Sequence, residues 1–243
     1  MTRVAAVDCG TNSIRLLISE IQEDGKIRDI SRTMEIVRLG QGVDATGEFD
    51  PAALARTRAA LEEYVKQMKF EKVERVRMVA TSATRDAKNH REFFDMTAEL
   101  LGQVQPGARA EVISGEEEAL LSFTGAVADL SSEKGPYCVI DLGGGSTEFV
   151  VGTIEGEILG SHSAQMGCVR LTERMMRSDP PTEAEVEIAT DYVAERMADV
   201  EKIVPIDKAV TFVGCAGTFT TLSALAQGME RYDADSILSL IHI

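Results

Sequence analysis

The chain has 243 residues, of which 44% are hydrophobic, and its 25 Lys and Arg against 40 Asp and Glu give a formal net charge of −15. No apolar stretch approaches the roughly 20 residues of a membrane-spanning helix, Asp8 interrupts the first apolar run where a secretory signal would continue it, and the acidic balance argues against a general nucleic-acid-binding protein. We therefore expect a cytoplasmic protein with two modest hydrophobic cores and with no membrane or nucleic-acid partner.

Cysteine and histidine are scattered along the chain. There are 4 Cys and 3 His, and no two cysteines form a C-x-x-C pair. This spacing fits neither a zinc site nor a disulfide scaffold, so we expect reduced and mostly buried thiols.

The first half of the chain predicts strands that precede helices. Apolar alternation predicts strands at residues 3–9, 14–20, 27–39, 73–80 and 110–113. A helix is predicted at 91–101. Asp50 followed by Pro51 is typical of a helix N-cap with proline at the first helical position, so another helix is expected to begin there. Strands followed by helices indicate an α/β architecture.

The second half repeats this pattern. Ser114 followed by Gly115 predicts the start of a helix that is rich in Glu in its first turn. The elements predicted after it are strands at 137–141, 147–154, 157–163 and 209–213, and a long helix at 182–202. Because no low-complexity linker separates the halves, we expect two closely apposed domains, residues 1–122 and 123–243.

An internal repeat decides the predicted architecture. Residues 7–14 and 140–147 place Asp, Gly and Ser at the same offsets, each time between two predicted strands. Each segment therefore predicts a hairpin with a glycine-rich tip that bears hydroxyl groups. Glycine lets backbone N–H groups approach an anion, Ser and Thr donate further hydrogen bonds, and an Asp at the strand end can hold a hydrated divalent cation.

One such hairpin alone would be an ordinary tight turn. Two copies at matched offsets favour a phosphate-binding cleft between two similar domains. A third turn of small residues, at 213–218, follows an apolar strand and precedes an apolar helix, where backbone dipoles favour phosphate. The alternative for this third turn is close packing of the helix on the strand.

Six motifs in order resemble the exopolyphosphatase and guanosine pentaphosphate phosphohydrolase (Ppx/GppA) family, within the actin, sugar kinase and heat-shock ATPase superfamily. They lie at residues 6–13, 38–43, 80–87, 113–119, 141–148 and 166–173. The similarity runs from Arg3 to about Ile237. It implies an α/β fold of two ribonuclease-H-like (actin-like ATPase) domains with an interdomain cleft.

The resemblance also implies a reaction, the hydrolytic removal of a terminal phosphoryl group from inorganic polyphosphate, with Mg²⁺ or Mn²⁺ as cofactor. Catalysis of such a step is mainly positioning and electrostatic stabilisation of dispersed negative charge. The first alternative is the same hydrolysis of guanosine pentaphosphate. A kinase-type phosphotransferase and a non-enzymatic filament or chaperone are further alternatives, which ATP-dependent phosphorylation of an acceptor or nucleotide-dependent assembly would support.

The resemblance assigns roles to individual residues. It makes Glu118 the base that orients the water, with Glu117 as the alternative. Without the resemblance, residues 116–118 would be interpreted as acidic side chains that interact favourably with the dipole at a helix N-terminus. Asp141 is implied as a catalytic residue and metal ligand, and Asp8 as a second metal ligand. Arg85 is the candidate cationic clamp, with a structural ion pair as its alternative. The implied phosphate contacts are Thr11, Asn12, Ser13, Arg15, Gly143, Gly144, Gly145, Ser146, Thr147, Gly217 and Thr218.

The last six residues, 238–243, can be encoded by CTG TCT CTT ATA CAC ATC, the end of a transposon-based sequencing adapter. We therefore expect that native sequence in this chain ends near Ile237, that the gene continues beyond it, and that the C-terminal domain here is incomplete. Sequencing the source locus with another library chemistry would test this. The acidic helices of the second half leave a homodimer open as an alternative to solvent exposure.

Overall fold

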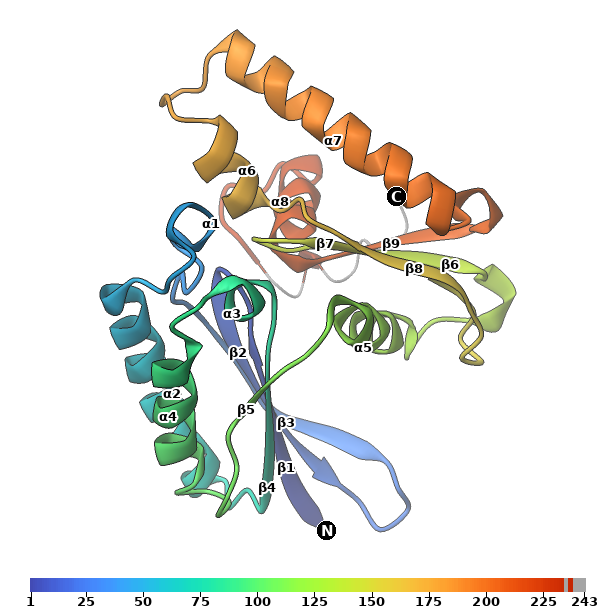
Figure 1. Ribbon diagram of the computed structural model, residues 1–243. Coiled ribbons are helices and arrows are strands. Elements are labelled where there is room, and N and C mark those ends of the chain that lie inside the picture. Colours follow the sequence, from blue (N-terminus) through green and yellow to red (C-terminus); the bar gives the residue numbers. More distant parts are fainter. Residues whose placement is uncertain (234–235, 238–243) are drawn as a thin grey trace. The chain divides into compact units, whose positions relative to one another are not determined.

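The computed structural model describes residues 1–233 and 236–237, so the suspected adapter-derived tail at 238–243 lies outside the described residues. The chain forms two compact units, Met1–Ile113 and Ser114–Ile243 (Figure 1). Each contains a sheet with helices packed on it, which confirms the predicted α/β class. The units divide directly before α5 (Gly115–Val127), whereas the sequence-based division after residue 122 falls inside this helix.

The first unit is built on a five-stranded sheet in the order β3-β2-β1-β4-β5. β2 pairs antiparallel with both β1 and β3, while β4 is parallel to β1 and β5. The strands are β1 (Thr2–Cys9), β2 (Ser13–Ile21), β3 (Ile27–Ile36), β4 (Arg75–Ala80) and β5 (Ala110–Val112), and the helices are α1 (Val43–Thr46), α2 (Pro51–Phe70), α3 (Ser82–Asp86) and α4 (His90–Leu101).

Helix α2 supports the hairpin of β1 and β2. It begins as predicted, with Pro51 at its first position and the Asp50 carboxylate accepting the backbone amides of residues 52 and 53. Its Tyr64 is fully buried and donates its hydroxyl to the carbonyl of Ile14 at 2.8 Å. This bond lies at the start of β2, directly after the glycine-rich tip, and so connects the tip to the core.

The second unit is built on a four-stranded sheet in the order β8-β7-β6-β9. The strands are β6 (Tyr137–Leu142), β7 (Thr147–Gly152), β8 (Ile158–Ala164) and β9 (Thr211–Cys215). The helices besides α5 are α6 (Cys168–Met175), α7 (Glu183–Ile203) and α8 (Ala216–Ala226), with short 3₁₀ turns at Ser132–Lys134 and Ile206–Lys208. Antiparallel β6–β7 and parallel β6–β9 match β1–β2 and β1–β4, which confirms the internal repeat.

Alternation along β6 supplies the two faces of this sheet with apolar side chains. Tyr137 and Val139 pack with Phe123 of α5, whereas Cys138 packs with Val200 of α7. Figure 1 shows α5 and α7 on opposite sides of the sheet. The first three residues of β6 and all six residues of β7 are therefore buried, with both faces of these strands covered.

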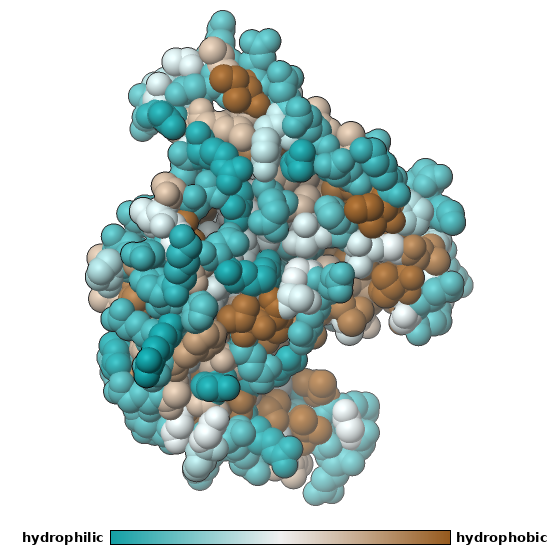
Figure 2. All heavy atoms as spheres, in the orientation of Figure 1, coloured by the Kyte–Doolittle hydropathy of each residue, from teal (hydrophilic) through white to brown (hydrophobic). Residues whose placement is uncertain are grey.

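Hydrophilic side chains cover most of the face shown in Figure 2, as the 27% of charged residues leads one to expect. Within residues 1–233 and 236–237, no helix is long and apolar enough to cross a membrane.

Candidate active site

Three carboxylates come together in the second unit, from α5, β6 and β7. Asp141, next to the last residue of β6, lies opposite Glu148 in the antiparallel pairing with β7. Glu118 lies in the first turn of α5, and its charge acts on Glu148. One turn further along α5, Ser122 donates its hydroxyl to Oδ2 of Asp141 at 2.5 Å, which ties the helix to the end of β6.

Glu148 is the buried member of this group. Glu148 is only 1% exposed. Its Oε1 accepts a hydrogen bond from the hydroxyl of Ser163, on β8, at 2.7 Å. Burial, together with the negative charges of Glu118 and Asp141, raises the pKa of Glu148 to about 8, against the lowering effect of hydrogen bonds from Ser163 and Ser146. Glu148 therefore keeps its proton over much of the neutral range.

Glu148 lies in the motif at residues 141–148, but no function is predicted for it from the sequence. The signal was present: Glu148 stands second in a strand whose other residues are Thr, Phe, Val, Val and Gly. A charged residue in such a fully buried strand is unusual unless it is paired or functional.

The loop between β6 and β7 presents backbone N–H groups. It is closed by the N–H of Gly143, which donates to the Ser146 carbonyl at 3.0 Å. The carbonyls of Gly143 and Gly144 accept backbone amides from the first residues of α6. Because the carbonyl and the next N–H of a trans peptide point in opposite directions, the N–H groups of Gly144 and Gly145 point away from α6. Such successive N–H groups form a site for an anion.

The hydroxyl groups of this loop have partners inside the unit. Ser146 is 2% exposed and bonds the Glu148 carboxyl group. Thr147 is 3% exposed and donates its hydroxyl to the carbonyl of Met166 at 2.5 Å. Their expected contact with phosphate stays a prediction, and the geometry gives both of them a structural function as well.

The third small-residue turn lies at the same edge of the sheet. Asp141 of β6 pairs with Cys215, the last residue of β9, and α8 begins directly after it. Gly217 and Thr218 therefore stand in the first turn of a helix whose N-terminus lies beside the end of β6. Their contact with phosphate stays a prediction.

In the first unit, the equivalent hairpin carries an ion pair. Asp8 and Arg15 are opposite residues of β1 and β2, and Nη1 of Arg15 lies 3.2 Å from Oδ2 of Asp8. The tip, with Thr11, Asn12 and Ser13, follows directly after β1. The expected functions of these five residues stay predictions, but the structure places the arginine and the carboxylate side by side.

Arg85 lies in the last turn of α3, which follows β4. Its Nη1 donates to the carbonyl of Ile113 at 2.9 Å, so one donor of the guanidinium holds the chain at the end of the first unit. The two functions expected of Arg85, a cationic clamp for phosphate or a structural ion pair, both remain predictions.

Among the described residues, no three or more His, Cys, Asp or Glu are arranged as a ready-made metal site. The donor set of the second unit nevertheless fits a hard divalent cation. Asp141, at the end of β6, supplies a carboxylate oxygen, and Mg²⁺ prefers one or two carboxylates together with water and phosphate oxygens.

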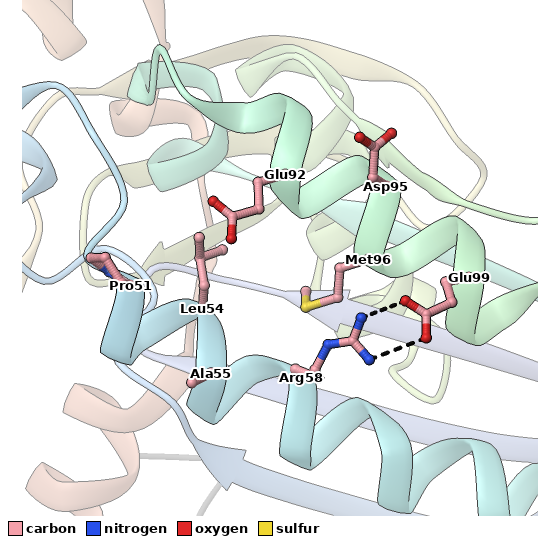
Figure 3. Close-up of a pocket in the computed structure, with 8 residues that line it drawn as sticks. All are labelled: Pro51, Leu54, Ala55, Arg58, Glu92, Asp95, Met96 and Glu99. Carbon is pink, nitrogen blue, oxygen red and sulfur yellow. Dashed lines mark hydrogen bonds and ion pairs between the residues drawn. The ribbon is translucent and has the colours of Figure 1, made fainter.

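Two cavities are lined by residues other than these carboxylates. One of about 390 Å³ lies between α2 and α4, where Arg58 reaches across to Glu99 (Figure 3). Its lining residues are Pro51, Leu54, Ala55, Arg58, Glu92, Asp95, Met96 and Glu99, none of which is a predicted site residue. The other, of about 400 Å³, lies beside β8 and α7, and its lining includes Ser163, the partner of Glu148. Neither cavity contains the carboxylates described above.

The model of the Ppx/GppA phosphatase family matches residues 17–241. Exopolyphosphatase 2 of Mycobacterium tuberculosis strain H37Rv is 58% identical over 98% of this chain and 75% of its own length. The guanosine-5'-triphosphate,3'-diphosphate pyrophosphatase of Vibrio cholerae serotype O1 is 31% identical over 97% of this chain and 45% of its own length. The crystal structure of the Aquifex aeolicus Ppx/GppA family member superposes with a TM-score of 0.72 at 37% identity, over 97% of this chain and 72% of that one. The chain therefore belongs to the Ppx/GppA phosphatase family and has the actin-like ATPase fold of its members.

Proposed function

We propose that this protein is an exopolyphosphatase, which hydrolyses the terminal phosphoanhydride bond of inorganic polyphosphate. The observation that carries the proposal is the group of Glu118, Asp141 and Glu148 beside the N–H groups of the loop at 143–146. The name and the 58% identity of the Mycobacterium tuberculosis relative support it.

In this proposal Glu118 accepts a proton from the attacking water. The water oxygen forms a bond to the terminal phosphorus, the bridging P–O bond breaks, and the shortened chain leaves with the bridging oxygen. Because Glu118 lies in the first turn of α5, the position of its carboxylate is set by a helix rather than by a mobile loop. Removing a general base of this kind lowers a rate by about 10²–10⁴-fold.

The other groups stabilise charge. The N–H groups of Gly144 and Gly145 bind non-bridging oxygens of the terminal phosphate, where negative charge accumulates in the transition state. Glu148 keeps its proton near neutral pH, so it adds little negative charge beside the phosphate. In the first unit, Thr11, Asn12, Ser13 and Arg85 are proposed as phosphate contacts.

Mg²⁺ or Mn²⁺ is the proposed cofactor. Asp141 is the proposed ligand in the second unit and Asp8 the proposed ligand in the first. When bound, the cation would neutralise phosphate oxygens and polarise the phosphorus. The cytoplasmic location and the homodimer considered from the sequence stay predictions.

The second candidate is hydrolysis of guanosine pentaphosphate, which the Vibrio cholerae relative favours by its name. The chemistry at the terminal phosphate is the same, so the two candidates differ only in what the leaving chain carries. The lower identity of that relative, 31% against 58%, places this candidate second.

A substrate panel separates the candidates. Orthophosphate release is measured from long polyphosphate, guanosine pentaphosphate and ATP, each with Mg²⁺ and with a chelator. We expect metal-dependent release mainly from polyphosphate. Release mainly from guanosine pentaphosphate would favour the second candidate, and release from none of the three would refute both.

A further inference from the structure

Helix α6 holds the inner side of the loop at 143–146. The backbone amide of Cys168 donates to the Gly143 carbonyl at 3.1 Å. The amides of Val169 and Arg170 donate to the Gly144 carbonyl at 2.9 and 3.0 Å. Nε of the Arg170 side chain then donates to the Gly145 carbonyl at 2.6 Å. Three successive carbonyls of the loop are therefore bonded to the beginning of α6.

These bonds determine where the other side of each peptide points. In the trans peptides of this loop, the N–H group that follows each carbonyl points the opposite way. The N–H groups of Gly144, Gly145 and Ser146 are consequently directed away from α6. The bond to Nε of Arg170 orients the last of them, which is the N–H of Ser146.

In the first unit, the carbonyls of the equivalent loop are held by backbone amides and not by an arginine side chain. There the Thr11 carbonyl accepts the amide of Gly40 at 2.8 Å, and the Asn12 carbonyl accepts the amides of Val37 and Arg38 at 3.1 and 2.8 Å. In the internal repeat Asn12 corresponds to Gly145. The side chain of Arg170 thus takes the place that backbone amides occupy in the other copy of the loop.

The contact between α6 and the loop leaves no room for a side chain at Gly167, the N-cap residue directly before the helix. A Cβ at Gly167 would lie 2.5 Å from the carbonyl carbon and oxygen of Gly144 and 2.7 Å from the nitrogen of Gly145. Real Cβ atoms do not approach backbone this closely, so any other residue at 167 must displace the loop. In the first unit Gly40 is equally close to Thr11, where a Cβ would lie 2.3 Å from Cγ2.

We infer that Arg170 is a positioning residue for catalysis: its Nε–H group holds the Gly145 carbonyl so that the loop N–H groups stay directed at the terminal phosphate. The inference rests on the proposed function, because that function supplies the phosphate. It assigns the effect of Arg170 to the hydrogen bond from Nε–H to the Gly145 carbonyl, and not to a direct action of the guanidinium charge on the phosphate.

Two substitutions separate the bond from the charge. In Arg170→Gln the side-chain amide nitrogen stands at the same number of bonds from Cα as Nε of arginine, so a donor is kept while the charge is lost. In Arg170→Met a side chain of similar length has neither donor nor charge. Arg174→Met is the matched control, because Arg174 lies one turn further along α6 with its guanidinium 5.9 Å from the centre of the Tyr192 ring.

The experiment measures kcat and KM for polyphosphate with Mg²⁺, and the response of the Gly144, Gly145 and Ser146 amide resonances to inorganic phosphate in ¹⁵N-labelled protein. We expect Arg170→Met to lower kcat/KM by roughly tenfold and to lose the phosphate response, as the loss of a part-buried hydrogen bond to the loop implies. Arg170→Gln and Arg174→Met should stay within about threefold of the wild type.

Two results overturn the inference: an Arg170→Met protein that matches the wild type, or an Arg170→Gln protein as impaired as Arg170→Met. Gly167→Ala provides a second variant, which keeps Arg170 but displaces the loop, and an unchanged phosphate response in it also contradicts the inference. If the wild type releases no phosphate from polyphosphate, the proposed function fails, and the amide response to inorganic phosphate still tests the loop.

Discussion

At the scale of single residues, Glu148 shows how a carboxyl group can be kept buried in a sheet. Its neighbours across the two pairings are Asp141 on β6 and Ser163 on β8. The Ser163 hydroxyl supplies one hydrogen bond and the Ser146 hydroxyl another. Since an isolated buried carboxyl group would cost several kcal/mol, these two hydroxyls make its position possible.

Ser163→Ala should therefore destabilise the protein. Removing the hydroxyl leaves Oε1 of Glu148 without that donor in a site from which water is excluded. We expect the free energy of unfolding to fall by about 1–3 kcal/mol. Urea titration of wild type and variant measures this change.

Ser161→Ala, on the same strand, is the control for that measurement. Ser161 pairs with Val150 rather than with Glu148. Its removal should cost less than about 0.5 kcal/mol, as is usual away from buried polar groups. Equal losses for the two serines would show that the bond to Glu148 contributes nothing.

At the scale of elements, the N-terminus of α7 contains a complete capping box. The Thr182 hydroxyl accepts the Glu185 amide at 3.3 Å, and the Glu185 carboxylate accepts the Thr182 amide at 2.8 Å. It also accepts the backbone amides of Arg177 and Ser178. These hydrogen bonds lower the pKa of Glu185 to about 2, and the bond from the Thr182 amide has the largest effect.

This lowered pKa predicts a pH dependence. The unfolded chain binds a proton at Glu185 near pH 4.5, whereas the folded chain does so only near pH 2. The carboxylate therefore stabilises the fold fully above pH 4.5, and its contribution is lost as the pH falls toward 2. Relative to Glu185→Gln, the wild type should be more stable at pH 7, and the difference should shrink below pH 4.5.

Urea unfolding at pH 7, 4.5 and 3.5 checks this expectation. Glu183→Gln is a matched control in the same helical turn, because Glu183 lies outside the capping box. A difference between wild type and Glu185→Gln that stays constant over these three pH values would contradict the account.

Elements were predicted from sequence where local pattern determines them. Asp50 and Pro51 identified the start of α2, because the cap and the proline act on their own neighbours. β3 was expected to continue to residue 39, but it ends at Ile36 because the next amides turn to the carbonyls of Thr11 and Asn12. α6 was not predicted as a helix, because its first residues are fixed by the carbonyls of a distant loop.

At the scale of the whole molecule, the internal repeat was the most informative feature of the sequence. Matched Asp, Gly and Ser offsets predicted two similar hairpins, and the order and direction of β3-β2-β1-β4 in the first unit are those of β8-β7-β6-β9 in the second. The site was predictable only in part. Glu118 and Asp141 were named from motifs, whereas Glu148 depends on cross-strand pairing and on the burial of β7, neither of which is local in sequence.

The central claim is that Glu118 acts as the base in hydrolysis of polyphosphate. The most direct test compares kcat for orthophosphate release from long polyphosphate, with saturating Mg²⁺, in wild type, Glu118→Gln and two controls from the same turn, Glu116→Gln and Glu117→Gln. The account predicts that Glu118→Gln lowers kcat by about 10²-fold or more, while both controls stay within about threefold of the wild type. A Glu118→Gln enzyme with wild-type kcat, or a loss confined to Glu117→Gln, would contradict it.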